Sequence, residues 1–201
     1  MKPPSFAYHA PHTLNEALSL LNQYGSDAKV LAGGQSLVPM MNFRVAQPAI
    51  LIDINRIKEL AYIKDDSNGV RIGAMTRQRT VERDATIAKR APLLHETVPH
   101  IAHPQIRNRG TIGGSIAHAD PASELPTVML TLNAKLLAKN AKGERWIEAK
   151  DFFVGLFTTA LEPDELLAEI HVPPMPARSG YAFEEVARRH GDYAMMGAAA
   201  T

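Results

Sequence analysis

The chain has 201 residues, of which 45% are hydrophobic and 21% are charged. Such a composition is typical of a globular protein with a substantial core and argues against disorder. Twenty-two Lys and Arg residues stand against twenty-one Asp and Glu residues, so neither sign dominates and nothing indicates binding to nucleic acid or to an anionic membrane surface. There is no cysteine, which excludes a thiolate-ligated iron–sulfur cluster, a disulfide and a cysteine nucleophile. Any redox centre held by this chain must therefore be a bound organic cofactor.

The first segment indicates a small α/β layer. Thr13 and Glu16 form a capping box before a run of apolar residues at helical spacing, and Gly25 is placed to end that helix. Strands are predicted at 28–31 and 49–54, the second with the continuous apolar character of a strand covered on both faces. We expect residues 1–55 to form one subdomain.

The remaining segments favour antiparallel structure. Residues 61–73 predict a hairpin that turns at 65–69, and Thr80 and Pro92 open predicted helices, the first running towards Arg90. His103–Pro121 reads as a long loop, followed by a helix at 123–132. Further strands are predicted at 134–138, 145–147 and 167–172, and a proline-rich connector leads to a hairpin at 181–200.

These elements predict a second subdomain at residues 56–177 and a terminal hairpin at 178–201. The sequence stops inside a strand pattern, which indicates that the hairpin is the start of a truncated C-terminal domain. No apolar run approaches the roughly 18 residues of a membrane span, and the N-terminus lacks a secretory signal. We expect a cytoplasmic protein.

Two glycine pairs carry the most chemical information. One lies in Ala32-Gly33-Gly34-Gln35-Ser36, directly after a predicted strand, and the other in Thr111-Ile112-Gly113-Gly114-Ser115. Glycine permits positive φ and close approach of a ligand, and successive amides in such turns can bind an anion without a lysine. Two such turns could hold a diphosphate from both sides, although each pair read alone is more often a plain tight turn. Neither segment is the G-x-G-x-x-G of a dinucleotide-binding helix or a nucleotide P-loop.

Together these segments closely resemble the paired FAD signatures of the flavoprotein subunit of molybdenum hydroxylases, a family that includes the medium subunit of carbon monoxide dehydrogenase and the FAD-binding subunit of xanthine dehydrogenase. The resemblance runs from about Pro4 to Ala200. It includes Asp53-Ile54, Ile72-Gly73-Ala74 before Thr76, Gln105-Ile106-Arg107-Asn108 and Gly191-Asp192-Tyr193-Ala194.

The resemblance implies an α+β fold of the p-cresol methylhydroxylase and vanillyl-alcohol oxidase type, with FAD held without a covalent bond between the small α/β subdomain and a larger antiparallel one. It implies FAD contacts at Ala32, Gly33, Gly34, Gln35, Ser36, Leu37, Ile101, Ala102, Thr111, Gly113, Gly114, Ser115, Glu124, Leu161 and Tyr193. No side chain is implied as a catalytic acid, base or nucleophile. Three positions depart from the family pattern: Gln35 for a common histidine, Ser115 for a common asparagine and Glu124 for a common aspartate. All three can still form hydrogen bonds.

The resemblance also implies partners. Electrons would leave a molybdenum cofactor in a large subunit, pass through [2Fe-2S] clusters in a small iron–sulfur subunit and reach FAD here, in a heterotrimer or its dimer. The external acceptor is open between NAD⁺ and a quinone or similar carrier. Two alternatives also remain open: a stand-alone flavoenzyme of the same fold, and a nucleotide-binding or scaffold module without redox activity.

Other candidates are weaker. The eight histidines show no metal-ligand spacing, so we expect no metal site in this chain. Arg107 and Arg109 flank the second glycine pair. Support of the diphosphate, contact with the iron–sulfur subunit and a solvent-facing position are all open for them.

Overall fold

The computed structural model describes residues 1–201. The chain folds into β-sheets and short α-helices. The α-helices are α1 (Leu14–Tyr24), α2 (Leu37–Asn42), α3 (Gln78–Arg83), α4 (Ala85–Arg90), α5 (Pro92–Thr97), α6 (Pro104–Arg107), α7 (Ile112–His118), α8 (Glu124–Thr131) and α9 (Ala149–Phe152). Three 3₁₀ turns are η1 (Gly25–Asp27), η2 (Lys58–Leu60) and η3 (Val98–His100). The strands are β1 (Ala7–His9), β2 (Ala28–Leu31), β3 (Ile50–Asp53), β4 (Ile63–Asp66), β5 (Gly69–Gly73), β6 (Lys135–Asn140), β7 (Gly143–Glu148), β8 (Phe153–Gly155), β9 (Thr158–Thr159), β10 (Leu166–Val172), β11 (Ala182–Val186) and β12 (Met196–Ala200).

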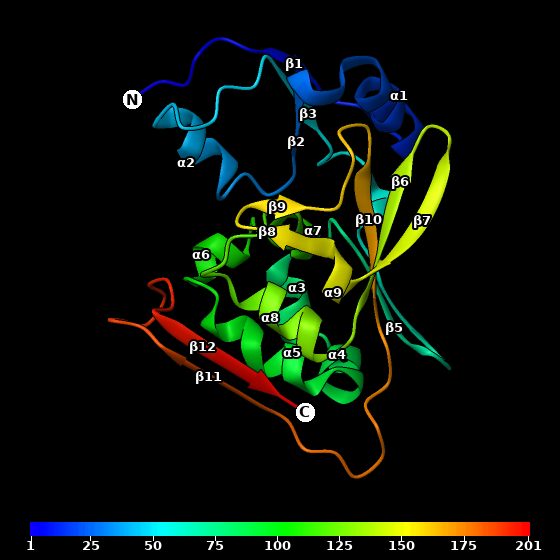
Figure 1. The fold of residues 1–201 in the computed structure, drawn as a ribbon, viewed down its shortest axis with the longest axis vertical. Helices are drawn as coiled ribbons and strands as arrows, with labels where there is room; N and C mark the ends of the chain where they lie inside the picture. Colours follow the sequence, from blue (N-terminus) through cyan, green and yellow to red (C-terminus); the bar gives the residue numbers. More distant parts are fainter.

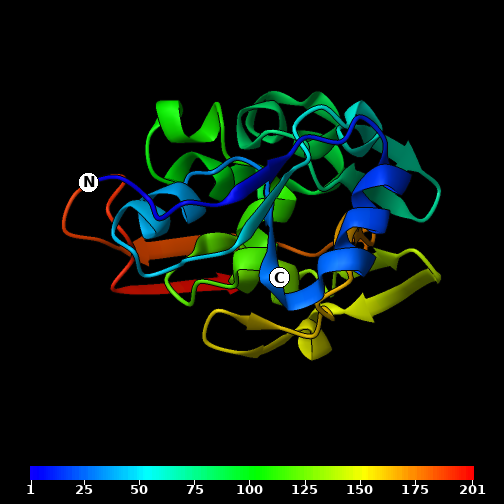
Figure 2. The ribbon, with the colours of Figure 1, turned by 90° about the horizontal axis from the view of Figure 1, so that it is seen from above.

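Two principal sheets organise these elements (Figure 1). A parallel three-stranded sheet has the order β1-β3-β2, and an antiparallel five-stranded sheet has the order β4-β5-β10-β6-β7. The strands β11 and β12 form a separate hairpin against α5 and α8. Seen from above, α1 and α2 lie on either side of the parallel strands (Figure 2). The mixed architecture with an antiparallel sheet agrees with the predicted α+β class.

The first helix forms for the reasons predicted. The Thr13 hydroxyl accepts a hydrogen bond from the Glu16 amide at 3.2 Å, and Gly25 takes φ +50 at the C-terminal end. Ala17, Leu18 and Leu21 are buried. Because these three residues share one helical face, α1 packs its apolar stripe onto the sheets and leaves its polar face to solvent.

Two predictions for the middle of the chain are wrong. The expected helix from Thr80 towards Arg90 is two helices, α3 and α4, which meet at Asp84. Asp84 has extended backbone angles, and its carboxylate caps α4 by accepting from the Thr86 and Ile87 amides at 2.8 and 3.1 Å. An aspartate at this position starts a new helix because its side chain satisfies the free amides of the first turn.

The predicted long loop at residues 103–121 contains two helices, α6 and α7. Pro104 occupies the first turn of α6, where a proline is tolerated, and the Thr111 hydroxyl caps α7. Helix α7 was not predicted because it contains a glycine pair, and glycine disfavours helical structure. The tertiary contacts that stabilise α7 involve residues far away in the sequence.

The hydrophobic residues form two cores. The larger, of 26 buried residues, fills the space between the five-stranded sheet and helices α3, α4, α5, α7 and α8. The smaller, of 11 buried residues, lies under α1 and the parallel sheet and also takes in Leu60, Met75, Leu166 and Ala168. Strand β10 therefore contributes side chains to both cores.

Candidate functional site

The first glycine-rich segment is the turn between β2 and α2. Gly34 has φ +73, a backbone conformation that favours glycine. The Gln35 side chain folds back and donates to the Gly33 carbonyl at 3.1 Å. None of the amides of residues 33–36 donates a hydrogen bond within the chain. This turn therefore offers four main-chain donors, which is the property predicted for an anion-binding turn.

The second glycine-rich segment differs from this expectation. The Gly114 amide donates to the Thr111 hydroxyl at 3.0 Å, as part of the α7 cap. The amides of Ile112, Gly113 and Ser115 donate to the carbonyls of Thr76, Ala74 and Thr111 at 3.0, 2.9 and 3.2 Å. Free amides were expected in both turns; the first turn has four, whereas within residues 111–115 only the Thr111 amide has no acceptor in the chain. The second turn instead offers the Ser115 hydroxyl, because its two glycines pack against Ala74, Thr111 and Ala32.

The structure brings the two segments into direct contact. A Cβ placed on Gly33 would lie 2.5 Å from the Arg109 carbonyl oxygen and 2.8 Å from the Gly110 Cα. A Cβ placed on Gly114 would lie 3.3 Å from the Ala32 Cβ. Gly33 is therefore needed for this close approach, since any larger residue there would push backbone from backbone, whereas a Cβ on Gly114 would meet the side chains of Thr111 and Ala32.

Asn55 and Arg77 connect the two segments, and the sequence reasoning missed both residues. The Asn55 amide donates to the Ala32 carbonyl at 2.7 Å and accepts from Arg77 Nη2 at 2.7 Å. Arg77 Nη1 donates to the Arg109 carbonyl. Burial and the nearby Arg109 charge lower the pKa of Arg77, and no carboxylate pairs with it. The available signal was Asp53-x-Asn55, whose spacing is typical of a side chain bonding the backbone two residues on.

A second group of predicted residues lies at the loop 99–103 and the terminal hairpin. Ile101 is buried, and Ala102 takes φ +43, which is uncommon outside glycine. Gly191 packs against this loop, because a Cβ on it would lie 3.0 Å from the Ala102 carbonyl oxygen. Tyr193 follows two residues later and is largely exposed.

Glu124 and Tyr193 share one electrostatic environment. Burial raises the pKa of Glu124, and the negative charges of Glu185 and Asp120 raise it further, while its own backbone amide and His100 oppose them. Partial desolvation raises the pKa of Tyr193, and so do the charges of Asp120 and Glu124. The structure therefore places Glu124 and Tyr193 close enough to interact electrostatically.

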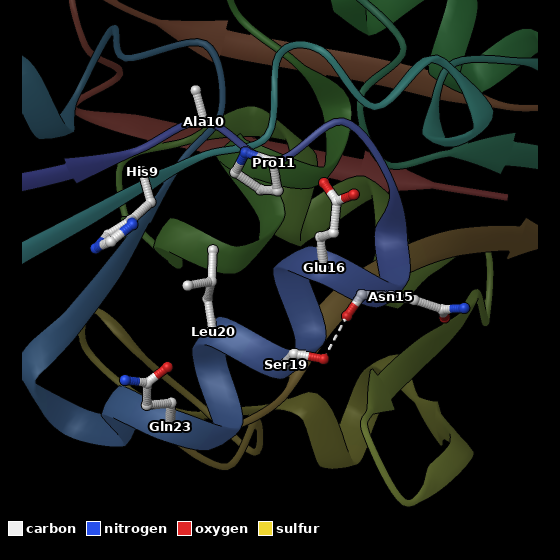
Figure 3. A pocket seen from close by; sticks show the side chains of 8 residues that line it. All are labelled: His9, Ala10, Pro11, Asn15, Glu16, Ser19, Leu20 and Gln23. Carbon is white, nitrogen blue, oxygen red and sulfur yellow. Dashed lines mark hydrogen bonds between the residues drawn. The ribbon is translucent and has the colours of Figure 1, made fainter.

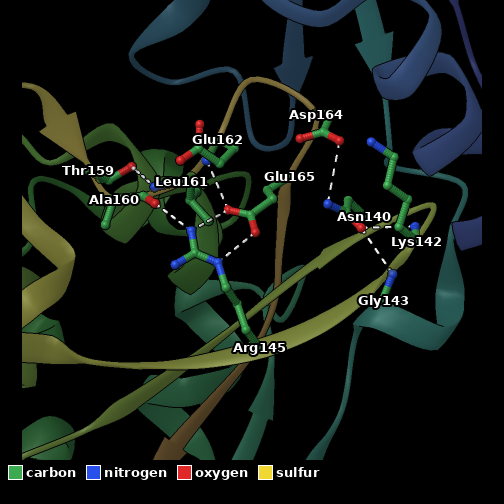
Figure 4. A network of polar contacts seen from close by, with 10 residues as sticks. All are labelled: Asn140, Lys142, Gly143, Arg145, Thr159, Ala160, Leu161, Glu162, Asp164 and Glu165. Atoms are coloured by element: carbon green, nitrogen blue, oxygen red, sulfur yellow. Dashed lines mark hydrogen bonds and ion pairs between the residues drawn. The ribbon is translucent and has the colours of Figure 1, made fainter.

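Leu161 lies apart from both groups along the chain, after β9 (Figure 4). Its amide donates weakly to the Thr159 hydroxyl at 3.4 Å, and its side chain packs against the larger core. The preceding Ala160 carbonyl accepts from Arg145 at 2.7 Å, and Arg145 also pairs with Glu165 through two bonds of 2.7 Å. This network orders the segment that carries Leu161.

Arg107 is not solvent-facing. It is 5% exposed, and its Nε donates to the Glu82 carboxylate at 2.8 Å. The open interpretations that placed it at the surface or on a diphosphate are therefore wrong, because its donors are already used inside the protein.

The surface hollows only partly coincide with this site. One hollow, of about 530 Å³, lies on the outer side of α1, and its lining includes no predicted site residue (Figure 3). The second, of about 510 Å³, is lined in part by Asn55, Thr76 and Arg77. No cluster of three or more His, Asp or Glu side chains has the geometry of a metal site. All helices are too short or too polar to cross a membrane.

Comparison with known proteins gives consistent matches across the chain. Residues 4–175 match the family described as FAD binding domain in molybdopterin dehydrogenase. The chain is 51% identical to the 6-hydroxypseudooxynicotine dehydrogenase complex subunit alpha of Paenarthrobacter nicotinovorans, over 99% of this chain and 67% of that protein. It is 47% identical to the carbon monoxide dehydrogenase medium chain of Hydrogenophaga pseudoflava, over 99% of this chain and 69% of that protein. A solved structure of carbon monoxide dehydrogenase from H. pseudoflava superimposes with a TM-score of 0.95 and 48% identity, covering 98% of this chain and 69% of that one.

Proposed function

Because the chain belongs to the family of FAD binding domains in molybdopterin dehydrogenases, we propose that it is the FAD-binding electron-transfer part of a multi-subunit molybdenum hydroxylase. It is an oxidoreductase component whose redox centre is non-covalent FAD. The absence of cysteine requires the iron–sulfur clusters to lie in another subunit, and the molybdenum cofactor lies in a third.

FAD supplies the redox chemistry when bound, accepting electrons from iron–sulfur clusters of a partner subunit and passing them to an external acceptor. The chain itself binds and orients the cofactor. The amides of residues 33–36 would donate to the diphosphate, and Gly33 lets the two glycine-rich segments lie in contact around it. The Ser115 hydroxyl adds a donor from the second turn.

The observation that carries this proposal is the contact between the two glycine-rich segments. They lie far apart in the sequence, yet Gly33 meets the backbone of Arg109 and Gly110 without room for a Cβ. The four donors of the first turn are free within the chain. Main-chain donors that have no acceptor within the chain are what a bound diphosphate requires.

Residues 101, 102, 124, 161 and 193 are proposed to contact the flavin and adenosine parts of FAD. The packing of Gly191 on the loop 99–103 and the electrostatic coupling of Tyr193 to Glu124 support the grouping of residues 101, 102, 124 and 193. The p-cresol methylhydroxylase type of fold and the boundaries at residues 55 and 177 stay predictions. The smaller core crosses the first boundary through Leu60 and Met75.

The partners follow from the same chemistry. We expect an iron–sulfur small subunit and a molybdenum large subunit, in a heterotrimer or its dimer. The substrate would be selected by the molybdenum subunit, and the acceptor is NAD⁺ or a quinone-like carrier. A cytoplasmic location accords with the sequence.

Purification of the full chain and titration with FAD test this proposal. We expect a flavin spectrum that titrates with one FAD per chain, and reduction of that flavin only when iron–sulfur and molybdenum subunits are added with their substrate. Direct reduction by a small substrate in the chain alone would favour a stand-alone flavoenzyme. No binding of FAD would refute the proposal in favour of a module without redox activity.

A further inference from the structure

Arg107 joins α6 to α3 through a buried ion pair with Glu82. Its Nε and Nη2 donate to the two carboxylate oxygens of Glu82 at 2.8 and 3.4 Å. Arg79 donates to the same carboxylate at 2.5 Å. Burial raises the pKa of Glu82, but the hydrogen bonds from Arg107 and Arg79 outweigh it and hold the pKa below its usual value. Glu82 therefore stays ionised, so Arg107 is held from one side by a fixed anion.

The other side of Arg107 binds three carbonyls of one loop. Its Nη1 lies 3.2, 2.8 and 3.2 Å from the carbonyl oxygens of Pro99, Ile101 and Ala102. Three carbonyl dipoles that point at one position repel each other unless a cation stands between them. Ala102 is held at φ +43, which an alanine adopts only when its surroundings enforce it. Arg107 therefore holds the loop at residues 99–103 in its observed conformation.

The loop at residues 99–103 in turn packs against the connection of the terminal hairpin. A Cβ on Gly191 would lie 2.4 Å from His103 Cε1 and 3.0 Å from the Ala102 carbonyl oxygen. Gly191 itself has φ +86, so its position is specified both by space and by backbone angle. A shift of the loop by a few tenths of an ångström would move this contact, and Tyr193 lies two residues further along the chain.

We propose that the Glu82–Arg107 pair is a positioning device that sets the loop 99–103, and through it Ile101, Ala102 and Tyr193, against the flavin. This inference rests on the proposed function, since those three residues are the proposed flavin-side contacts. Arg107 does not touch the cofactor and acts through the loop. A lysine cannot replace it, because an ammonium lacks the planar fork that binds a carboxylate on one side and carbonyls on the other.

The test compares Arg107→Lys and Glu82→Gln with Arg90→Lys in the full chain. Arg90 is a matched control, because its guanidinium also binds a carboxylate (Asp65, 2.8 Å) and a carbonyl (Asp66, 2.8 Å), at a hairpin outside the proposed site. The readouts are the visible circular dichroism of bound FAD, its midpoint potential and its dissociation constant. Hydrogen exchange at residues 100–103 is measured without FAD.

We expect Arg107→Lys to change the visible circular dichroism, to shift the midpoint potential and to weaken FAD binding by roughly tenfold, with faster exchange at residues 100–103. Arg90→Lys should match the wild type in every flavin readout. If Arg107→Lys does not fold, Glu82→Gln carries the test, because it keeps the shape of the side chain and removes only its charge. A wild-type flavin spectrum, potential and affinity in the folded variant would overturn the inference.

The two proposals fail separately. If the wild-type chain binds no FAD, the proposed function is refuted. The exchange data then decide whether Arg107 holds the loop, and unchanged exchange in the variant would overturn that part too.

Discussion

The substitution Gly33→Ala addresses the contact on which the site depends. The new Cβ would lie 2.5 Å from the Arg109 carbonyl oxygen and 2.8 Å from the Gly110 Cα, where ordinary contact begins at 3.4 Å. Both obstacles are backbone, so no side chain can rotate away. The two segments must therefore separate by up to about 0.9 Å at this point.

The energetic consequence can be bounded. Forcing an extra methyl group into a packed contact costs about 1–3 kcal/mol. The chain can relieve this strain by moving the turns apart, but the cofactor requires them together. FAD binding should then bear most of the cost, which corresponds to roughly five- to 150-fold weaker binding.

Flavin fluorescence titration and a thermal melt without FAD measure the two effects separately. Gly180→Ala is the control, because a Cβ at Gly180 meets nothing within 4 Å, and it should leave both quantities unchanged. If Gly33→Ala bound FAD as tightly as the wild type, the reasoning that the two turns hold one cofactor would be refuted.

Three further predictions concern the surrounding framework. Asn55→Ala should cost about 1 kcal/mol of unfolding free energy in urea, because Ala32 and Arg77 lose a partly buried hydrogen-bond partner, and it should also weaken FAD binding. Asp84→Ala should cost about 1 kcal/mol by urea denaturation, because α4 loses its cap; Asp84→Asn should retain most of it. Glu124 has a raised pKa in the folded chain, so its contribution to stability is complete below the ordinary value of 4.5 and is lost as the pH rises through the raised value. Glu124→Gln should therefore raise the melting temperature without FAD more at pH 7 than at pH 4.

Each of these has an outcome that would contradict it. Equal urea midpoints for Asn55→Ala and the wild type would show that the bridge to Arg77 is not stabilising. Equal midpoints for Asp84→Ala and Asp84→Asn would exclude the cap. A melting temperature of Glu124→Gln that differs from the wild type equally at both pH values would show that the buried charge is not the cause.

Local patterns predicted the periodic elements well. The α1 helix with its Thr13 cap and the strands β2, β3 and β10 formed within one or two residues of their predicted positions, and the terminal hairpin formed within three. The structure of these elements is specified by residues close together in the sequence, since apolar spacing and helix caps act over a few positions. The two glycine-rich segments also lie in contact in the structure, and their joint binding of one diphosphate stays a prediction.

The errors occurred where distant contacts decide the structure. Helix α7 contains two adjacent glycines, and its first amides are paired with the carbonyls of Ala74 and Thr76. Nothing within residues 111–115 indicates those acceptors, so the expected free amides were assigned to both turns. The position of Arg107 was left open for the same reason, because its partner Glu82 lies 25 residues away and the neighbouring residues show only a charged side chain beside a turn.

Strand β10 belongs to both hydrophobic cores at once. Leu166 and Ala168 enter the smaller core, and Leu167, Ile170 and Val172 enter the larger one. A strand shared in this way couples the melting of one half to the melting of the other. Amide protection should accordingly disappear from both halves in a single step, and a chain with one half loosened should not keep the other as an independent native unit.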